Sequence, residues 1–314
     1  MKLEFQMEDD EADAEKAVNA YNTLKDNGMK VFIGTVTTGA CLSVVSQTKA
    51  DNMFQITPSA SAAKVIANDN CFQVCFTDPN QGTASADYIA SKGLATKVAV
   101  IYNSSDAYSS GIYDNFKAEA AAKGLDLVAS EAFTGDSKQD FSSQLSKIKA
   151  SGAELIFLPI YYQEASLILS QAKNAGITAK FFGCDGLDGL LNIENFDKSL
   201  AENVMLLTPF AANATDETTK KFVAAYNAKY DPSTLNQFAA DAYDAVYIVK
   251  AAAEKAGITG DMSVSDICNA LKGAMTEITV DGVTGSGMTW KATGEVNKEP
   301  KAVKIENGEY QPMD

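Results

Sequence analysis

Short apolar runs alternate with longer amphipathic segments along most of the chain. Runs such as 97–103 (KVAVIYN) and 154–160 (ELIFLPI) are almost continuously apolar, which is typical of strands covered on both faces. Segments such as 13–28 and 140–152 repeat apolar positions at helical spacing and end at a glycine, which predicts helices. This alternation indicates parallel sheets with helices on both faces.

The same pattern predicts the other elements and their grouping. Further strands are expected at residues 2–8, 30–35, 52–59, 71–76, 125–133, 180–186 and 203–210. Further helices are expected from Thr38 onward and at residues 80–94, 110–123, 162–176, 216–230 and 236–257, with hairpin-like alternation over 286–311. Two such series in 314 residues predict an α/β protein with two doubly wound parallel-sheet lobes joined by short hinge strands. We expect residues 1–95 plus 234–293 to form lobe 1, and residues 96–233 plus 294–314 to form lobe 2.

The amino-acid composition limits which catalytic mechanisms, metal sites and binding partners are possible. The chain has 26 Lys, no Arg and no His, against 41 acidic residues, for a net charge of −15. Without His there is no Ser-His-Asp triad, no His proton shuttle and no HExxH zinc site, so neither catalytic residues nor a metal are expected. Without Arg, a bound anion must be held by backbone N–H groups, hydroxyls, helix N-termini or Lys. The negative charge disfavours nucleic acid and anionic membranes as partners.

Cysteine usage and hydropathy argue against a disulfide-rich protein and against a membrane-spanning one. The five cysteines are odd in number and widely scattered, so buried free thiols are expected rather than a disulfide framework. No apolar run approaches the ~20 residues of a membrane span. The opening segment lacks the apolar core of a signal peptide.

The loops that follow the expected strands carry six short motifs in a recognisable order. They are GTVTTGA at 34–40, ITPSASA at 56–62, FQVCFTDPNQG at 72–82, VIYNSSDAYSSG at 100–111, LPIYYQEASLILSQAKNAG at 158–176 and FFGCDG at 181–186. In order and spacing, the chain resembles the branched-chain amino-acid type of extracytoplasmic solute-binding protein of ABC importers. These are type I periplasmic binding proteins, similar to the leucine/isoleucine/valine-binding protein. The resemblance implies a ligand cleft between two lobes at the carboxyl ends of the strands, where open α/β sheets bind ligands.

The resemblance also implies roles for individual positions. Thr38 matches a hydroxyl residue that helps to bind the ligand carboxylate, Ser59 a position that uses its backbone, and Ser61 a hydroxyl residue at the amino-acid head group. Asp185 matches the acidic residue that holds the ligand ammonium. The other expected contacts are cleft tyrosines at Tyr108 and Tyr161, a hinge-side aromatic at Phe238, and the DxxQG segment of Asp78 and Gln81 at the first lobe crossing.

The residue chemistry agrees with these roles, although each residue also has a purely structural interpretation. Thr38 and Ser61 each stand at the start of a predicted helix, where a carboxylate meets unsatisfied N–H groups and the positive end of the dipole. Either residue could instead be only an N-cap. Asp185 could be a turn residue in a glycine-flanked loop, and the tyrosines could be sheet-edge aromatics with a wet hydroxyl. Tyr162 competes with Tyr161 for the cleft position.

Two departures from the family pattern stand out. The family normally has a strand, a GPxTG-like loop and a helix before the segment that begins here at Met1, and the 314 residues do not include that unit. Its loss would leave an exposed edge on the first sheet. The second departure is Gln73, where many relatives have Arg.

We therefore expect a non-enzymatic, cofactor-free protein that binds a free amino acid, leucine, isoleucine or valine, by lobe closure. It would deliver this ligand to the permease subunits of an ABC importer, outside the cytoplasm. One alternative is the ligand-sensing domain of a receptor for amino acids or related small carboxylates. Another is an α/β enzyme, which the absence of a GxGxxG or Walker loop and of a nucleophile–base pair disfavours.

Overall fold

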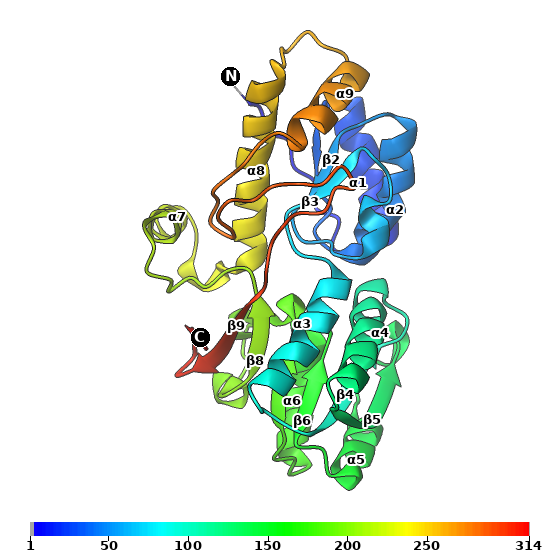
Figure 1. Cartoon of the computed structure of the whole chain (residues 1–314), viewed down its shortest axis with the longest axis vertical. Coiled ribbons are helices and arrows are strands. Elements are labelled where there is room, and N and C mark those ends of the chain that lie inside the picture. Colours follow the sequence, from blue (N-terminus) through cyan, green and yellow to red (C-terminus); the bar gives the residue numbers. More distant parts are fainter. Residues whose placement is uncertain (1–2, 314) are drawn as a thin grey trace. The chain divides into compact units, whose positions relative to one another are not determined.

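A computed structural model describes residues 3–313 of the chain. These residues form two compact units, shown in Figure 1. Among them, unit 1 comprises residues 3–77 and Phe238–Glu299, and unit 2 comprises Asp78–Gln237 and residues 300–313. The chain therefore passes between the units after Thr77, Gln237 and Glu299.

Unit 1 is built on a parallel sheet of three strands in the order β1-β2-β3. The strands are β1 (Phe32–Ile33), β2 (Gln55–Thr57) and β3 (Cys71–Gln73), and the helices are α1 (Ala14–Asp26), α2 (Thr38–Ala50), α8 (Gln237–Ala256) and α9 (Val264–Met275). Successive residues of a strand face opposite sides of a sheet. Accordingly, Gln55 bonds to Thr48 of α2 on one side, whereas Ile56 packs in the apolar core formed with α8 and α9 on the other.

Unit 2 contains a sheet of seven strands in the order β10-β9-β8-β7-β6-β4-β5. The strands are β4 (Lys97–Asn103), β5 (Asp126–Phe133), β6 (Leu155–Leu158), β7 (Lys180–Gly183), β8 (Met205–Thr208), β9 (Lys301–Glu306) and β10 (Glu309–Pro312). The strands β4 to β8 run parallel, and β9 is antiparallel to both of its neighbours. The fold is thus α/β with a doubly wound parallel sheet, as the periodicity predicted.

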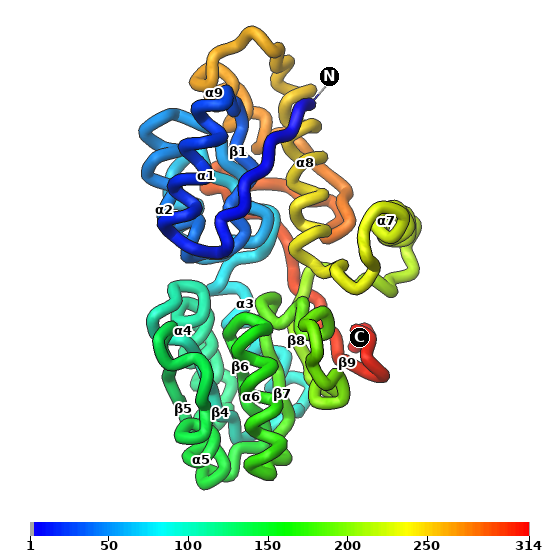
Figure 2. The backbone as a smooth tube through the Cα atoms, turned by 180° about the vertical axis from the view of Figure 1, so that it is seen from behind, coloured from blue at the N-terminus to red at the C-terminus, as the bar shows by residue number. Residues whose placement is uncertain are grey.

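Helices cover both faces of the unit 2 sheet. The helices of this unit are α3 (Asp78–Ser91), α4 (Ala107–Ala122), α5 (Ser142–Ser151), α6 (Tyr162–Asn174) and α7 (Glu217–Asn227). Apolar residues of α3 and α4 share one core with the strands, and those of α5 and α6 share the other. Figure 2, the view from behind, shows α6 in front of the strands that α3 partly covers in Figure 1.

The structure corrects the expected lobe boundaries. Residues 78–95 were expected in lobe 1, but they belong to unit 2 because α3 packs directly on α4. Gly82 permits this approach, since a Cβ there would lie 2.5 Å from the carbonyl oxygen of Ile112. Residues 234–237 also belong to unit 2, and residues 294–299 to unit 1. In unit 1 the Gln73 N–H bonds to the Gly294 carbonyl.

Three local features differ from the expectations. Residues 3–8 are not a strand, and Phe5 and Met7 are 62% and 90% exposed, so this segment buries no apolar face. Lys2, the first residue of that expected strand, lies outside the described residues. The helix α9 was not predicted. The C-terminal hairpin is β9 and β10, and residues 286–296 form only isolated bridges, such as that of Trp290 with Val296.

Candidate functional site

The start of α2 carries the first group of predicted site residues. The Thr38 hydroxyl accepts hydrogen bonds from the backbone N–H of Ser61, at 3.1 Å, and of Ala62, at 3.4 Å. The N-cap of α2 is Thr37, not Thr38, and its side chain makes no capping bond. The interpretation of Thr38 as only an N-cap is therefore wrong, because its hydroxyl ties the loop after β2 to the first turn of α2.

Several hydroxyls are buried beside this helix start. Thr38, Ser59 and Ser61 are 1%, 6% and 1% exposed. Within residues 3–313, neither Ser61 Oγ nor Thr37 Oγ1 has a hydrogen-bond partner, although both atoms are buried. Burying a hydroxyl without a partner costs about 1–3 kcal/mol. A carboxylate bound here would accept from these hydroxyls and from the first-turn N–H groups of α2, at the positive end of the helix dipole.

Ser61 does not begin a helix of its own, contrary to expectation. The element that follows is a 3₁₀ turn over Ala63–Ile66 whose N-cap is Ala62. Ser61 reaches the helix start of α2 through the Thr38 bond instead. Its proposed role in binding an anion therefore depends on α2 and not on a local dipole.

Asp185 anchors the second group, at the carboxyl end of β7 in unit 2. It is 1% exposed and begins a short 3₁₀ turn, and the Tyr108 hydroxyl donates to its Oδ1 at 2.6 Å. The Gly186 N–H donates to the same hydroxyl oxygen at 2.8 Å. Burial, and then the Asp185 carboxylate, raise the pKa of Tyr108 well above its usual value. Tyr108 therefore stays protonated and donates to the carboxylate.

Tyr161, and not Tyr162, joins this group. The Tyr161 ring stacks on the Tyr108 ring, with centroids 4.7 Å apart. Tyr161 is the N-cap of α6, and Tyr162 is its first helical residue. Tyr162 packs instead against the core beneath α5 and α6, where its ring lies beside Gly189. The two neighbouring tyrosines thus face different surroundings, as consecutive residues at a helix start do.

Two glutamines hold the backbone of Asp185 on either side. The Asp185 N–H donates to Gln81 Oε1 at 3.3 Å, and Gln237 Nε2 donates to the Asp185 carbonyl at 2.8 Å. Gln81 was expected near the site as part of the DxxQG segment, whereas Gln237 was not predicted. Its signal was weak, since it is a polar residue at the start of a long helix and the partners of its amide are distant in sequence.

The remaining predicted residue, Phe238, follows Gln237 in α8 and is half-buried. It belongs to unit 1, whereas Tyr108, Tyr161 and Asp185 belong to unit 2. The predicted residues thus form two groups, one in each unit.

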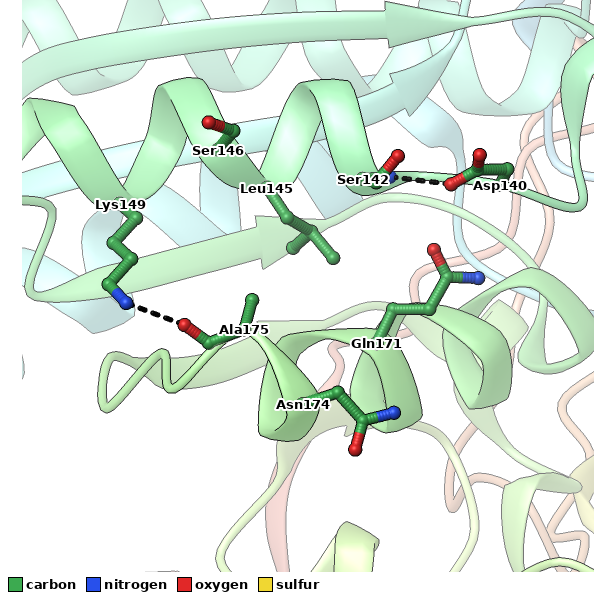
Figure 3. Close-up of a pocket in the computed structure, with 8 residues that line it drawn as sticks. All are labelled: Asp140, Ser142, Leu145, Ser146, Lys149, Gln171, Asn174 and Ala175. Carbon is green, nitrogen blue, oxygen red and sulfur yellow. Dashed lines mark hydrogen bonds between the residues drawn. The ribbon is translucent and has the colours of Figure 1, made fainter.

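A groove elsewhere in unit 2 contains none of the predicted residues. Figure 3 shows it between α5 and α6, where Lys149 donates to the Ala175 carbonyl at 2.6 Å and Ser142 N–H to Asp140 at 2.9 Å. Gln171, which also lines the groove, accepts a hydrogen bond from the Phe141 N–H at 2.7 Å. The side chains of Asp140, Lys149 and Gln171 thus bond to backbone groups around the groove.

All five cysteines are free and buried, and burial raises the pKa of Cys41 and of Cys71 to about 12, so neither is a thiolate nucleophile. Within residues 3–313, no three Cys, Asp or Glu side chains are grouped to hold a metal ion. No helix in that range has the length and apolar content to cross a bilayer.

The two units, the parallel sheets and the polar groups at the strand ends define a binding protein of the type I periplasmic fold. The sequence profile of the periplasmic binding protein family matches residues 1–309, and the chain belongs to that family. The family expected from the motifs is thereby confirmed.

Individual relatives support this assignment. The chain is 32% identical over 263 residues to the Leu/Ile/Val-binding protein homolog 3 of Brucella melitensis, covering 83% of this chain and 70% of that protein. It is 28% identical over 272 residues to the leucine-, isoleucine-, valine-, threonine- and alanine-binding protein of Pseudomonas aeruginosa, covering 86% and 71%.

Solved structures show the same fold. The leucine binding protein LivK of Thermotoga maritima superposes with a TM-score of 0.86 at 25% identity, covering 98% of this chain and 85% of that one. The branched-chain amino acid transporter substrate binding protein LivJ of Streptococcus pneumoniae, solved in complex with isoleucine, gives 0.84 at 27% identity, covering 97% and 84%.

Proposed function

We propose that this chain is the substrate-binding component of an ABC importer for a free branched-chain amino acid: leucine, isoleucine or valine. It captures the ligand outside the cytoplasm and passes it to the permease subunits without chemical change. The ligands named for its relatives support this choice of substrate class.

The main support is that the two groups of site residues have opposite chemistry. The group at the start of α2 presents buried hydroxyls and a helix N-terminus, which suit a carboxylate. The group at the end of β7 presents a buried carboxylate, Asp185, which suits an ammonium. An α-amino acid carries both charged groups on one carbon. This pairing requires neither Arg nor His, and the chain contains neither.

Each unit alone complements only one end of such a zwitterion. In the proposed mechanism, one ligand engages Thr38, Ser59 and Ser61 of unit 1 together with Asp185 and the tyrosines of unit 2. A ligand that contacts both units stabilises the closed form over the open one, because only the closed form makes both sets of contacts. Hinge closure of this kind moves each unit as a rigid body.

Calorimetric titration with a panel of free amino acids tests the proposal. At least one of leucine, isoleucine and valine should bind with a Kd of about 1 μM or tighter, close to −8 kcal/mol. Two probes act as controls: 4-methylpentanoate lacks the ammonium, and 3-methylbutylamine lacks the carboxylate. Both should bind far more weakly than leucine, since each leaves one group of site residues unpaired.

The proposal fails if the folded chain binds no amino acid in the panel, or binds both control probes as tightly as leucine. A parallel assay with ester, phosphate and nicotinamide substrates tests the enzyme alternative. No turnover is expected, and catalysis that co-purifies with the folded chain would favour that alternative.

A further inference from the structure

Two glutamine side chains hold the backbone of Asp185, and each lies beside a point where the chain crosses between the units. Gln81 lies in the first turn of α3, directly after the crossing at Thr77, and accepts the Asp185 N–H. Gln237 is the last residue of unit 2 before the chain enters unit 1, and its amide donates to the Asp185 carbonyl. Both glutamines are fully buried.

Gln237 uses every polar group that it has, apart from its carbonyl, in this region. Its backbone N–H donates to Asp188 Oδ2 at 2.8 Å, and its Oε1 accepts from the Thr208 hydroxyl at 3.0 Å. The Asp188 N–H in turn donates to the Asp185 carbonyl at 2.9 Å. The turn from Asp185 to Asp188 is thus fastened at both ends to one residue of α8.

This arrangement has a consequence for the direction of the Asp185 side chain. The strand β7 ends at Gly183, so the position of Asp185 is not set by the sheet ladder. Gly186 lies so close to Tyr108 that a Cβ would be 2.6 Å from its hydroxyl oxygen. The turn therefore has little room to move, and the two glutamine bonds act with the Tyr108–Gly186 bond to hold its backbone in place. Binding groups must be held to within about 0.5 Å of their productive position.

Resting on the function proposed above, we propose that Gln237, assisted by Gln81, is a positioning residue for ligand binding. It fixes the Asp185 turn so that the carboxylate meets the ligand ammonium. Gln237 itself does not touch the ligand. Because it sits at a chain crossing, it also links the placement of Asp185 to the segment through which the chain leaves unit 2.

The test measures leucine affinity by calorimetry for the unaltered chain, Gln237→Met, Asp185→Asn and the double variant. Methionine keeps the length of the side chain and the backbone bond to Asp188 but removes the amide. We expect Gln237→Met to raise the Kd about tenfold, the order of one lost buried hydrogen bond, because the Asp185 carbonyl then keeps only the Asp188 N–H as donor. In the Asp185→Asn background the same substitution should change the Kd by less than about twofold, because the group that it positions has already lost its charge.

A matched control is available in the same unit. Gln171 also uses its amide to hold a loop, accepting from the Phe141 N–H and donating to the Gln139 carbonyl. It lines the groove of Figure 3 and is not bonded to Asp185. Gln171→Met should lower the thermal midpoint without changing leucine affinity. If Gln237→Met does not fold, Thr208→Val removes the hydroxyl that orients the Gln237 amide, and the same cycle is run with it.

The outcomes separate this inference from the function on which it rests. If the unaltered chain binds no amino acid, both fail. If it binds leucine but folded Gln237→Met binds it equally well, only the positioning role fails. It also fails if Gln237→Met weakens binding by the same factor with and without Asp185→Asn, since an independent structural effect would be additive.

Discussion

One buried carboxylate, Asp185, supplies the only charge in the proposed contacts to the ligand ammonium. Replacing it with Asn keeps the shape and the acceptor for Tyr108 but removes the charge. We expect Asp185→Asn to weaken leucine binding by about 2–5 kcal/mol, because a buried ammonium is then left without a counter-ion. Titration calorimetry measures this change directly.

An exposed aspartate in the same unit provides the control for that substitution. The side chain of Asp197 is 59% exposed and caps the turn over Lys198–Ala201. Asp197→Asn should leave leucine affinity unchanged. Equal affinities for Asp185→Asn and the unaltered chain would remove Asp185 from the site.

Asp188 makes stability depend on pH. Burial is the main cause that raises its pKa to about 7, and the titratable groups that face it are Asp185 and Tyr310. An unfolded aspartate titrates near ~3.9. Between these values the folded chain holds a proton that the unfolded chain releases. The contribution of Asp188 to the stability of the folded chain is therefore complete below pH ~4 and is lost as the pH rises through about 7.

The comparison of the unaltered chain with Asp188→Asn isolates this effect from the other carboxylates. From pH 4 to 7, the free energy of unfolding of the unaltered chain should fall relative to the variant, by at most about 1.4 kcal/mol per pH unit. Urea unfolding at several pH values measures both curves. Parallel curves would contradict the assignment of a raised pKa to Asp188.

Single residues show what could be anticipated from sequence. The motifs indicated Tyr161 and Asp185, but only the structure separates Tyr161, which stacks on Tyr108, from Tyr162, which packs in the core. Thr38 was identified for its hydroxyl, yet the bond to the Ser61 N–H depends on a loop more than 20 positions away. Spacing in one segment carries no information about such partners.

At the scale of elements, Gly82 allows the backbones of α3 and α4 to approach each other closely. At Gly82 a Cβ would lie 2.5 Å from the Ile112 carbonyl oxygen and 2.7 Å from the Phe116 nitrogen. Gly82→Ala should therefore force the helices apart and destabilise the fold by about 1–3 kcal/mol. Chemical denaturation measures the loss.

A second helical glycine gives the opposite prediction. Gly273 lies in α9, and a Cβ there meets nothing within 4 Å. Gly273→Ala should stabilise the chain by about 0.5–1 kcal/mol, because alanine restricts the unfolded state and suits a helix. A loss of stability at Gly273 equal to that at Gly82 would show that close packing is not the cause.

Elements were predictable where periodicity and length were both clear. The strand expected at 97–103 has those bounds as β4, and the helix expected from Thr38 begins there as α2. Residues 2–8 alternate like a strand, but residues 3–8 form no strand in either of the described sheets. An apolar pattern yields a strand only when a partner edge is present.

At the scale of the whole molecule, the proposed mechanism predicts a change in size on binding. One ligand must reach both units, so saturating leucine should lower the radius of gyration measured by small-angle X-ray scattering. Asp185→Asn at the same leucine concentration should show little change, because it binds weakly. An unchanged radius at proven saturation would contradict closure as the means of capture.

The presence of two units was predictable from the sequence, but their boundaries were not. Two βα series predicted two lobes, whereas the boundaries at Thr77 and Gln237 depend on packing. Helix α3 follows the strands of unit 1 in sequence but joins unit 2 through its contact with α4. Sequence order alone could not assign it, since the deciding contacts lie about 30 residues further along the chain.

By itself, the sequence determined the α/β class, the absence of Arg and His chemistry, and the family, because periodicity, composition and ordered motifs are local properties. The tertiary structure decided which hydroxyls are buried together beside α2, which of Tyr161 and Tyr162 stacks on Tyr108, and that Gln81 and Gln237 hold the backbone of Asp185. Those facts depend on residues distant in sequence, which only the packing of helices on sheets brings within hydrogen-bonding distance.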